Sequence, residues 1–161
     1  MGAHNAINSS ENPFWQYSIV QYSKPGCADF LLDAQNRDQL NINQLLFFGY
    51  CAFHNRVVSS PLHPQIHNWH EEKVERIRAI RLRCKHFNNQ KFYAALKELE
   101  LASEQHEQYL LLQLQMTRKS HEDFEQCLRK SVEGLLIDER KKLNEDWLQT
   151  LNQYLQPMAG D

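Results

Sequence analysis

The stretch that decides the fold is YSKPGCADFLLDAQNRDQLNINQLLFFGYC, residues 22–51. Pro25-Gly26 and Asn41 divide it into two segments, and each segment carries apolar residues at helical rather than alternating spacing. The first segment has four apolar residues at i, i+3, i+4 and i+7: Cys27, Phe30, Leu31 and Ala34. The second leaves almost no polar face, with Leu45, Leu46, Phe47, Phe48, Tyr50, Cys51 and Phe53. The stretch therefore predicts a helical hairpin whose second helix is buried inside the fold.

The composition predicts an all-α fold. Hydrophobic residues make up 42% and charged residues 24% of the 161 residues, which is ordinary for a globular protein. Five Gly, five Pro and only two Thr disfavour a turn-rich β architecture. We expect an N-terminal three-helix module (13–53) packed on a long antiparallel helical hairpin, followed by one or more C-terminal helices. The formal net charge of −2 means that any nucleic-acid surface has to be a local patch.

The domain organisation and location are also predicted from the sequence. Residues 1–11 are expected to be a disordered N-terminus or an expression remnant, residues 12–156 a single helical domain and residues 157–161 a tail. The start lacks a signal peptide and no segment reaches about 18 apolar residues, so we expect a cytoplasmic protein without a membrane span. No C-x-x-C pair occurs, so the cysteines are expected to be reduced packing residues: Cys27, Cys51, Cys84 and Cys127.

Helix-breaking residues and the spacing of apolar residues predict the remaining helices. Asn12-Pro13 predicts the start of a helix over 13–23, and residues 54–64 are expected to be a loop. A long helix over 65–87 is expected to pair with a second over 90–119. The predicted buried line of the first comprises Trp69, Val74, Ile77, Ile80, Cys84 and Phe87.

Two further helical segments follow. Ser120 with Asp123 predicts a capping box that starts a helix, which Gly134 is expected to interrupt. A last helix ends before Pro157. Surplus apolar residues predict a surface that faces another chain, with the C-terminal helices joining a homodimer: Leu110, Leu111, Leu112, Trp147, Leu151 and Tyr154.

Three motif blocks accompany this pattern. The first block begins with Y-x-x-P-G-x-A, which matches Tyr22, Pro25, Gly26 and Ala28. It continues with L-x-x-Q at Leu32 and Gln35, and with N-x-L-L-F at Asn43, Leu45, Leu46 and Phe47. The second block is Trp69 with Val74, Ile77, Arg78, Ile80, Arg81 and Lys85, and the third is Glu100, Leu101 and Glu104. Over about residues 14–110 the chain resembles the domain-of-unknown-function family numbered 2390, which comprises short helical proteobacterial proteins.

The resemblance implies a helical fold and no activity. We interpret the motif residues as structural rather than catalytic: Tyr22, Pro25, Gly26, Gln35, Asn43, Phe47 and Trp69. Three positions depart from the family pattern, with Cys27 in place of valine, Asn36 in place of aspartate and Tyr50 in place of tryptophan. All three are core or turn positions that tolerate a change of size.

No local catalytic motif occurs, so neither a catalytic residue nor a cofactor is predicted. The strongest metal candidate is His63, His67 and His70, spaced i, i+4, i+7. Because Pro64 places His63 at the helix cap, we favour exposed polar histidines and predict no metal site. His106 falls on an apolar stripe and is expected to be a hydrogen-bonded histidine at the edge of the core.

The only strong charge asymmetry is basic. Residues 76–85 contain five cations and no acid: Arg76, Arg78, Arg81, Arg83 and Lys85. They are the candidate binding residues, since such a helix face can contact a phosphate backbone. The alternative is internal pairing, in which a turn at Asn88-Asn89 brings Arg78 and Arg81 near Glu98 and Glu100, and Lys73 near Glu104. We favour internal pairing.

Three function hypotheses remain from the sequence. We expect a non-enzymatic protein-interaction or adaptor module, whose partner is an unknown protein or a second copy of the chain. The alternative is a nucleic-acid-binding or ribosome-associated protein that uses the basic helix 76–85. The third is an enzyme with a dispersed site, in which His106, or Gln35 with Asn43, would line a pocket.

Overall fold

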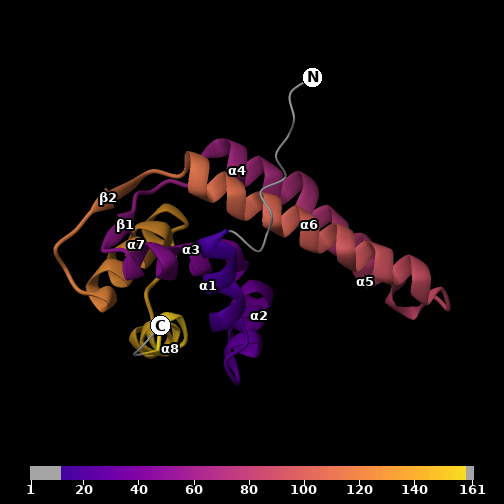
Figure 1. Ribbon diagram of the computed structural model, residues 1–161, viewed down its shortest axis with the longest axis horizontal. Helices are drawn as coiled ribbons and strands as arrows, with labels where there is room; N and C mark the ends of the chain where they lie inside the picture. The colour runs from indigo at the N-terminus through magenta and orange to yellow at the C-terminus, as the bar shows by residue number, and fades with distance from the viewer. Residues whose placement is uncertain (1–11, 159–161) are drawn as a thin grey trace. The chain divides into compact units, whose positions relative to one another are not determined.

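The computed structural model describes residues 12–158, which form helices and one short two-stranded ribbon (Figure 1). The chain makes two compact units: unit 1 combines the chain up to Pro61 with the chain from Met116 onward, and unit 2 is residues 62–115. The predicted N-terminal segment 1–11, and residues 159–161 of the predicted tail, lie outside the described residues. The all-α prediction is confirmed except for the ribbon.

The N-terminal half of unit 1 follows from its caps. Helix α1 (Pro13–Tyr22) begins after Asn12, whose side-chain oxygen accepts hydrogen bonds from two backbone N–H groups at 3.0 and 3.3 Å. Helix α2 (Cys27–Asp38) follows Gly26, whose φ of 83° favours glycine. Helix α3 (Ile42–Phe53) begins after Asn41 and is buried nearly all round. The predicted hairpin of α2 and α3 is confirmed.

The ribbon corrects two sequence predictions. Strand β1 (Arg56–Val58) lies in the predicted loop, and it pairs antiparallel with β2 (Thr117–Lys119) where the long helix was expected to continue. Val57 and Val58 are buried, and the N–H of Val58 donates to the Ser131 hydroxyl at 2.9 Å. Each strand needs a partner about 60 residues away. Local spacing therefore could not reveal either of them.

Helices α7 (Phe124–Asp138) and α8 (Glu145–Leu155) complete unit 1 by packing against α3. The side chain of Asp123 accepts from the N–H of Gln126 at 2.9 Å, so Asp123 rather than Ser120 is the N-cap. Gly134 does not interrupt α7, which runs unbroken from Phe124 to Asp138 and packs against α3 and α8.

The apolar residues of α8 are used inside unit 1. Leu151 is fully buried. The rings of Trp147 and Tyr154 lie 5.8 and 5.4 Å from the ring of Phe30. Of the apolar positions of α8 that suggested a surface for another chain, Leu151 is therefore covered by the chain itself, whereas Trp147 and Tyr154 are half-buried.

Side chains of α1 and of the loop that follows α1 bind the last turn of α8. The hydroxyl of Tyr17 donates to the backbone carbonyl of Leu155 at 2.5 Å. The ammonium of Lys24 donates to the carbonyls of Tyr154 and Gln156 at 3.1 and 2.7 Å. These donors satisfy carbonyls that a helix leaves unpaired at its C-terminus.

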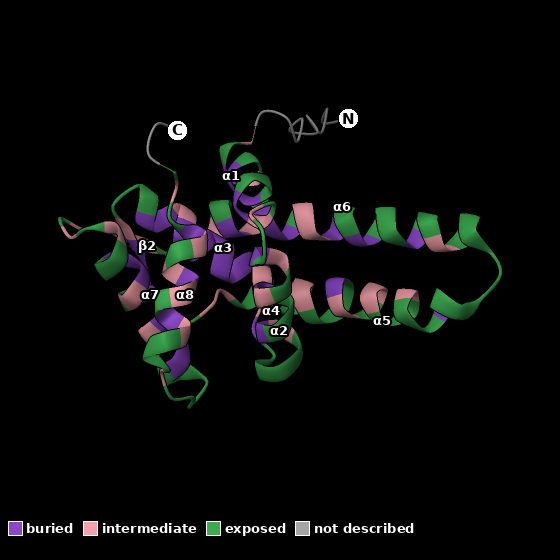
Figure 2. Cartoon of the chain, turned by 90° about the horizontal axis from the view of Figure 1, so that it is seen from below, coloured by how far each residue is buried: buried purple, intermediate pink, exposed green. Residues whose placement is uncertain are grey.

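Unit 2 is a helical hairpin. Its first arm runs through α4 (Pro64–Trp69), a π-helical turn (His70–Val74), α5 (Glu75–Arg83) and a 3-10 turn (Cys84–His86). Helix α6 (Gln90–Leu114) returns beside it, ending at Leu114 rather than near Lys119. Figure 2 shows few buried residues where the two arms approach their connecting turn. Within residues 12–158, no helix is both long enough and apolar enough to span a membrane.

Candidate functional site

The two arms of the hairpin are joined by an ionic network centred on Arg78. Its guanidinium donates to three carboxylates, those of Glu75 at 2.6 Å, Glu100 at 3.2 Å and Glu104 at 3.3 Å. Glu100 and Glu104 belong to α6, so one side chain of α5 fixes the register of both helices. Such charge-assisted bonds are stronger than neutral ones because donor and acceptor are both ionised.

Arg81 extends the network by one turn. Its guanidinium donates to both carboxylate oxygens of Glu100 and, at 3.2 Å, to the hydroxyl of Tyr93. Glu100 is only 8% exposed, and both arginines form ion pairs with its carboxylate. Internal pairing is therefore confirmed for Arg78 and Arg81 with Glu100, and the contact with Glu104 comes from Arg78.

A second pair lies on the π-helical turn. The Nδ1 atom of His70 is 2.6 Å from a carboxylate oxygen of Glu107, which is fully buried, and Nε2 is 3.1 Å from Glu75. Burial lowers the pKa of His70, but the hydrogen bond that it donates to Glu107 and the charges of Glu107 and Glu75 together raise it above its usual value. Sequence reasoning missed this pair, although the register that matches Arg78 with Glu100 also matches His70 with Glu107.

Glu104 has the most perturbed carboxyl group of this network. Burial raises its pKa to about 7, against the lowering effect of Arg78, and the nearby charges of Glu100 and Glu107 add to the increase. The carboxyl of Glu104 therefore exchanges its proton near neutral pH.

Trp69 and His106 mark one side of the hairpin. The indole N–H of Trp69 donates to the backbone carbonyl of Ser103 at 2.9 Å, and its ring lies 4.2 Å from the His106 ring. His106 itself is exposed, so it is not the core-edge histidine that its spacing predicted. The rings of Trp69 and Tyr109 contact the imidazole and leave it exposed to solvent.

The three histidines considered as metal ligands have separate roles. His63 caps α4 by accepting from the N–H of Gln65 at 3.2 Å, and His67 is exposed. His70 belongs to the pair with Glu107. Among residues 12–158, no group of three His, Cys, Asp or Glu side chains is placed to hold a metal ion.

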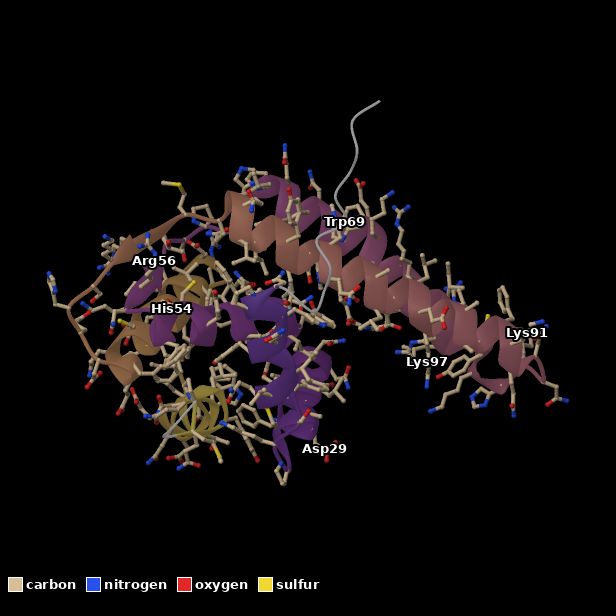
Figure 3. The ribbon with its side chains drawn as sticks, in the orientation of Figure 1. Asp29, His54, Arg56, Trp69, Lys91 and Lys97 are labelled. Atoms are coloured by element: carbon tan, nitrogen blue, oxygen red, sulfur yellow. The ribbon has the colours of Figure 1, made fainter. Side chains whose placement is uncertain are left out.

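The remaining cations of the basic run are solvent-exposed. Arg76, Arg83 and Lys85 form no ion pair with any residue of the described chain. Residues 76–97 contain seven Lys and Arg residues and no acid, and only Arg78 and Arg81 are neutralised within the hairpin. Figure 3 shows Lys91 beside the connecting turn, with Lys97 farther along α6.

The same part of the hairpin exposes large apolar side chains. Ile80 and Phe87, which the spacing placed on a buried line, are 47% and 65% exposed. The expectation fails because Arg78 and Arg81 occupy the contact of α5 with α6. We call this region the hairpin tip and define its exposed apolar residues as Ile80, Leu82, Phe87, Phe92 and Leu99.

None of the structural motif residues belongs to the hairpin tip. Gly26 caps α2, Phe47 is buried with its ring 5.4 Å from that of Phe14, and Asn43 is 9% exposed. Tyr22 and Gln35 are half-buried and Pro25 is exposed. Six of the seven motif residues thus belong to unit 1, and Trp69 belongs to unit 2.

The described pockets do not gather the residues proposed for a dispersed enzyme site. A groove of about 570 Å³ on unit 1 is lined by residues that include Asp33, Arg37, Lys141 and Trp147. Gln35 and Asn43 do not line it.

The cysteine thiols are poor candidates for nucleophiles. All four are free and buried. Burial raises the pKa of Cys27 to about 11 and that of Cys51 to about 12. The reactive thiolate is therefore scarce at neutral pH for these two residues.

Comparisons with known proteins give a family and no activity. A family model described as a protein of unknown function, DUF2390, matches residues 13–111. No curated protein and no solved structure matches the chain. The match confirms the resemblance seen in the sequence motifs, and it spans the three N-terminal helices and most of the hairpin.

Proposed function

We propose that this chain, which belongs to the DUF2390 family of proteins of unknown function, is a non-enzymatic protein-interaction module that binds its partner through the hairpin tip. The observation that carries the proposal is the exposure of Ile80, Leu82, Phe87, Phe92 and Leu99 on one short stretch of two helices. Clustered apolar side chains of this size mark interaction surfaces, because leaving them in water is unfavourable.

The ionic network favours binding because it fixes the two arms of the hairpin relative to each other before a partner binds. Arg78 and Arg81 hold α5 against Glu100 of α6, so the two arms keep one register without a large apolar core between them. A surface that is rigid before binding loses less conformational entropy when the partner arrives. The buried thiols of high pKa support binding over nucleophilic catalysis, and as free thiols they support a cytoplasmic location.

A partner other than a second hairpin tip is favoured by charge. Joining two tips would bring their unpaired cations together, including Arg76, Arg83 and Lys85 from each copy. The apolar residues of α8 that suggested a homodimer are engaged inside unit 1. We therefore propose a different protein as the partner.

Nucleic acid is the second candidate, and one observation favours it. Phe87 and Phe92 are 65% and 49% exposed, next to Lys85 and Lys91 at the connecting turn. Exposed aromatic rings among cations can stack with unpaired bases. Phe87 was expected on a buried line of the helix, so the sequence did not reveal this exposed ring.

Affinity capture from the native cell extract tests both candidates. The wild-type chain is compared with Leu99→Asp, which places a charge in the exposed apolar cluster, and each extract is divided into nuclease-treated and untreated halves. We expect one protein partner that survives nuclease and is lost with Leu99→Asp. A partner lost only on nuclease treatment would support the nucleic-acid candidate instead.

A further inference from the structure

Helical spacing places the exposed apolar residues of α6 on one side of the hairpin. Phe92, Leu99 and His106 are seven residues apart, so they lie along nearly one line of the helix. The ring of Trp69 contacts the ring of His106, which identifies this line with the Trp69 side of the hairpin. Glu100, one residue round from Leu99, points to the ionic network instead.

The matching line on α5 is also apolar. Ile77 and Ile80 precede Cys84 at helical spacing, one stripe away from Arg78 and Arg81. The register that pairs Arg78 with Glu100 places Ile80 at the level of Leu99. Phe87 follows the 3-10 turn after α5, in the connecting turn and five residues before Phe92. We call these four exposed residues the apolar seam: Ile80, Phe87, Phe92 and Leu99.

One rim of the apolar seam is basic. Arg76 and Arg83 lie four residues before and three residues after Ile80, on the outer side of α5. They are two helical turns apart, about 10 Å along the axis. Both are exposed, and neither forms an ion pair within the described part of the chain.

The rim on α6 differs in size and charge. Ala95 and Ala102 lie on α6 beside the line of Leu99, on the side away from α5. Glu98 lies beyond them round the helix. Small side chains allow another helix to approach closely. Glu98 repels carboxylates on this rim, so an acidic partner would place its charges toward α5.

We infer that the apolar seam receives an amphipathic helix of a partner protein, with carboxylates about seven residues apart along the flank that faces Arg76 and Arg83. The inference rests on the proposed function and specifies its partner. An amphipathic helix supplies an apolar stripe for Ile80 and Leu99, whose side chains have no ring on which a base could stack. Carboxylates opposite the unpaired arginines fix the orientation of the bound helix.

Two synthetic peptides test the partner chemistry with the full-length protein. Both are helical, about 20 residues long, and share a leucine stripe. The first carries glutamates along one flank of the stripe, and the second has the same composition with the glutamates moved to the opposite face. Binding is measured by fluorescence anisotropy at low salt, beside a single-stranded RNA oligonucleotide.

We expect the first peptide to bind at least about tenfold more tightly than the second. The double variant Arg76→Glu, Arg83→Glu is expected to reduce its affinity about tenfold or more. The matched variant Lys119→Glu, Lys142→Glu, which reverses two exposed cations of unit 1, is expected to change it by less than about twofold. Circular dichroism checks that both variants keep their helices.

Equal binding of the two peptides, or equal losses in the two double variants, overturns the inference. So does binding of the RNA, weakened by Arg76→Glu, Arg83→Glu, in the absence of peptide binding. Failure of the peptides alone, with capture of a protein partner still lost on Leu99→Asp, overturns the acidic-helix inference and leaves the proposed function standing. If the peptides fail and Leu99→Asp captures the same protein as the wild-type chain, both the acidic-helix inference and the proposed function are overturned.

Discussion

Glu107 is fully buried, and its carboxylate accepts a short hydrogen bond from the ring of His70. Replacing it by alanine leaves the imidazole of His70 without this partner inside the hairpin. We expect Glu107→Ala to lower the free energy of unfolding by about 3 kcal/mol. Urea denaturation measures the change.

The control is Glu98→Ala, on the exposed side of the same helix. We expect this change to stay within about 0.5 kcal/mol. Equal effects of the two substitutions would contradict a stabilising role for the buried pair.

Glu104 makes the stability of the hairpin depend on pH. Its pKa is about 7 in the folded chain and 4.5 in the unfolded one, so the folded state binds more protons between these values. The free energy of unfolding therefore falls as pH rises from 4.5 to about 7. Because Glu104 is partly exposed, we expect Glu104→Gln to remove about 1 to 2 kcal/mol of this decrease.

Denaturation of both proteins at several pH values measures the difference. The raised pKa of His70 contributes stability below pH 6.5 that is lost as pH rises above it, so some decrease remains in the variant. An unchanged slope between pH 4.5 and 7 in Glu104→Gln would contradict the burial of this carboxyl.

Gly49 allows the last turn of α8 to pack against α3. A Cβ atom at this position would lie 2.9 Å from the Cβ of Leu155 and too close to the Tyr17 hydroxyl. We expect Gly49→Ala to lower the unfolding temperature and to cost about 3 kcal/mol, because α8 must move. Gly134→Ala in α7 is the matched control, since its Cβ meets only the movable side chain of Ser60.

At the level of elements, α5 and α6 are paired by charge rather than by a large apolar contact. Arg81 and Glu100 are both mostly buried and joined by hydrogen bonds at both carboxylate oxygens. A double-mutant cycle with Arg81→Ala and Glu100→Ala is expected to give a coupling free energy of about 1 to 3 kcal/mol. A coupling near zero would show that the register is fixed by other contacts.

The sequence predicts elements well where the signal is local. The caps at Asn12 and Asn41, the buried face of α3 and the break at Asn88-Asn89 follow from neighbouring residues. The β1–β2 ribbon does not, because each strand is three residues long and pairs across about 60 residues.

The candidate site was only half predictable for a related reason. Pairing of Arg78 and Arg81 follows from charge and register. Exposure of Ile80 and Phe87 depends on how few elements surround the hairpin tip, which a helical period cannot show.

In the whole molecule, unit 2 is an insertion in unit 1. The N–H of Ser59 donates to the carbonyl of Met116 at 2.9 Å, so the chain leaves and re-enters unit 1 at neighbouring points. We expect a chain in which about five glycine and serine residues replace residues 62–115 to keep its helices and unfold cooperatively. A shortened chain that fails to fold would instead support the single domain predicted for residues 12–156.

The central claim is that the hairpin tip binds a protein, and crosslinking at Phe92 tests it most directly. A photoreactive phenylalanine analogue is placed at Phe92 and, as control, at Ile137, an exposed apolar residue of unit 1. Both proteins are irradiated in their native cells. The account predicts one discrete protein adduct from Phe92 and none from Ile137. Adducts from Ile137 alone, or nucleic acid as the crosslinked species at Phe92, would contradict it.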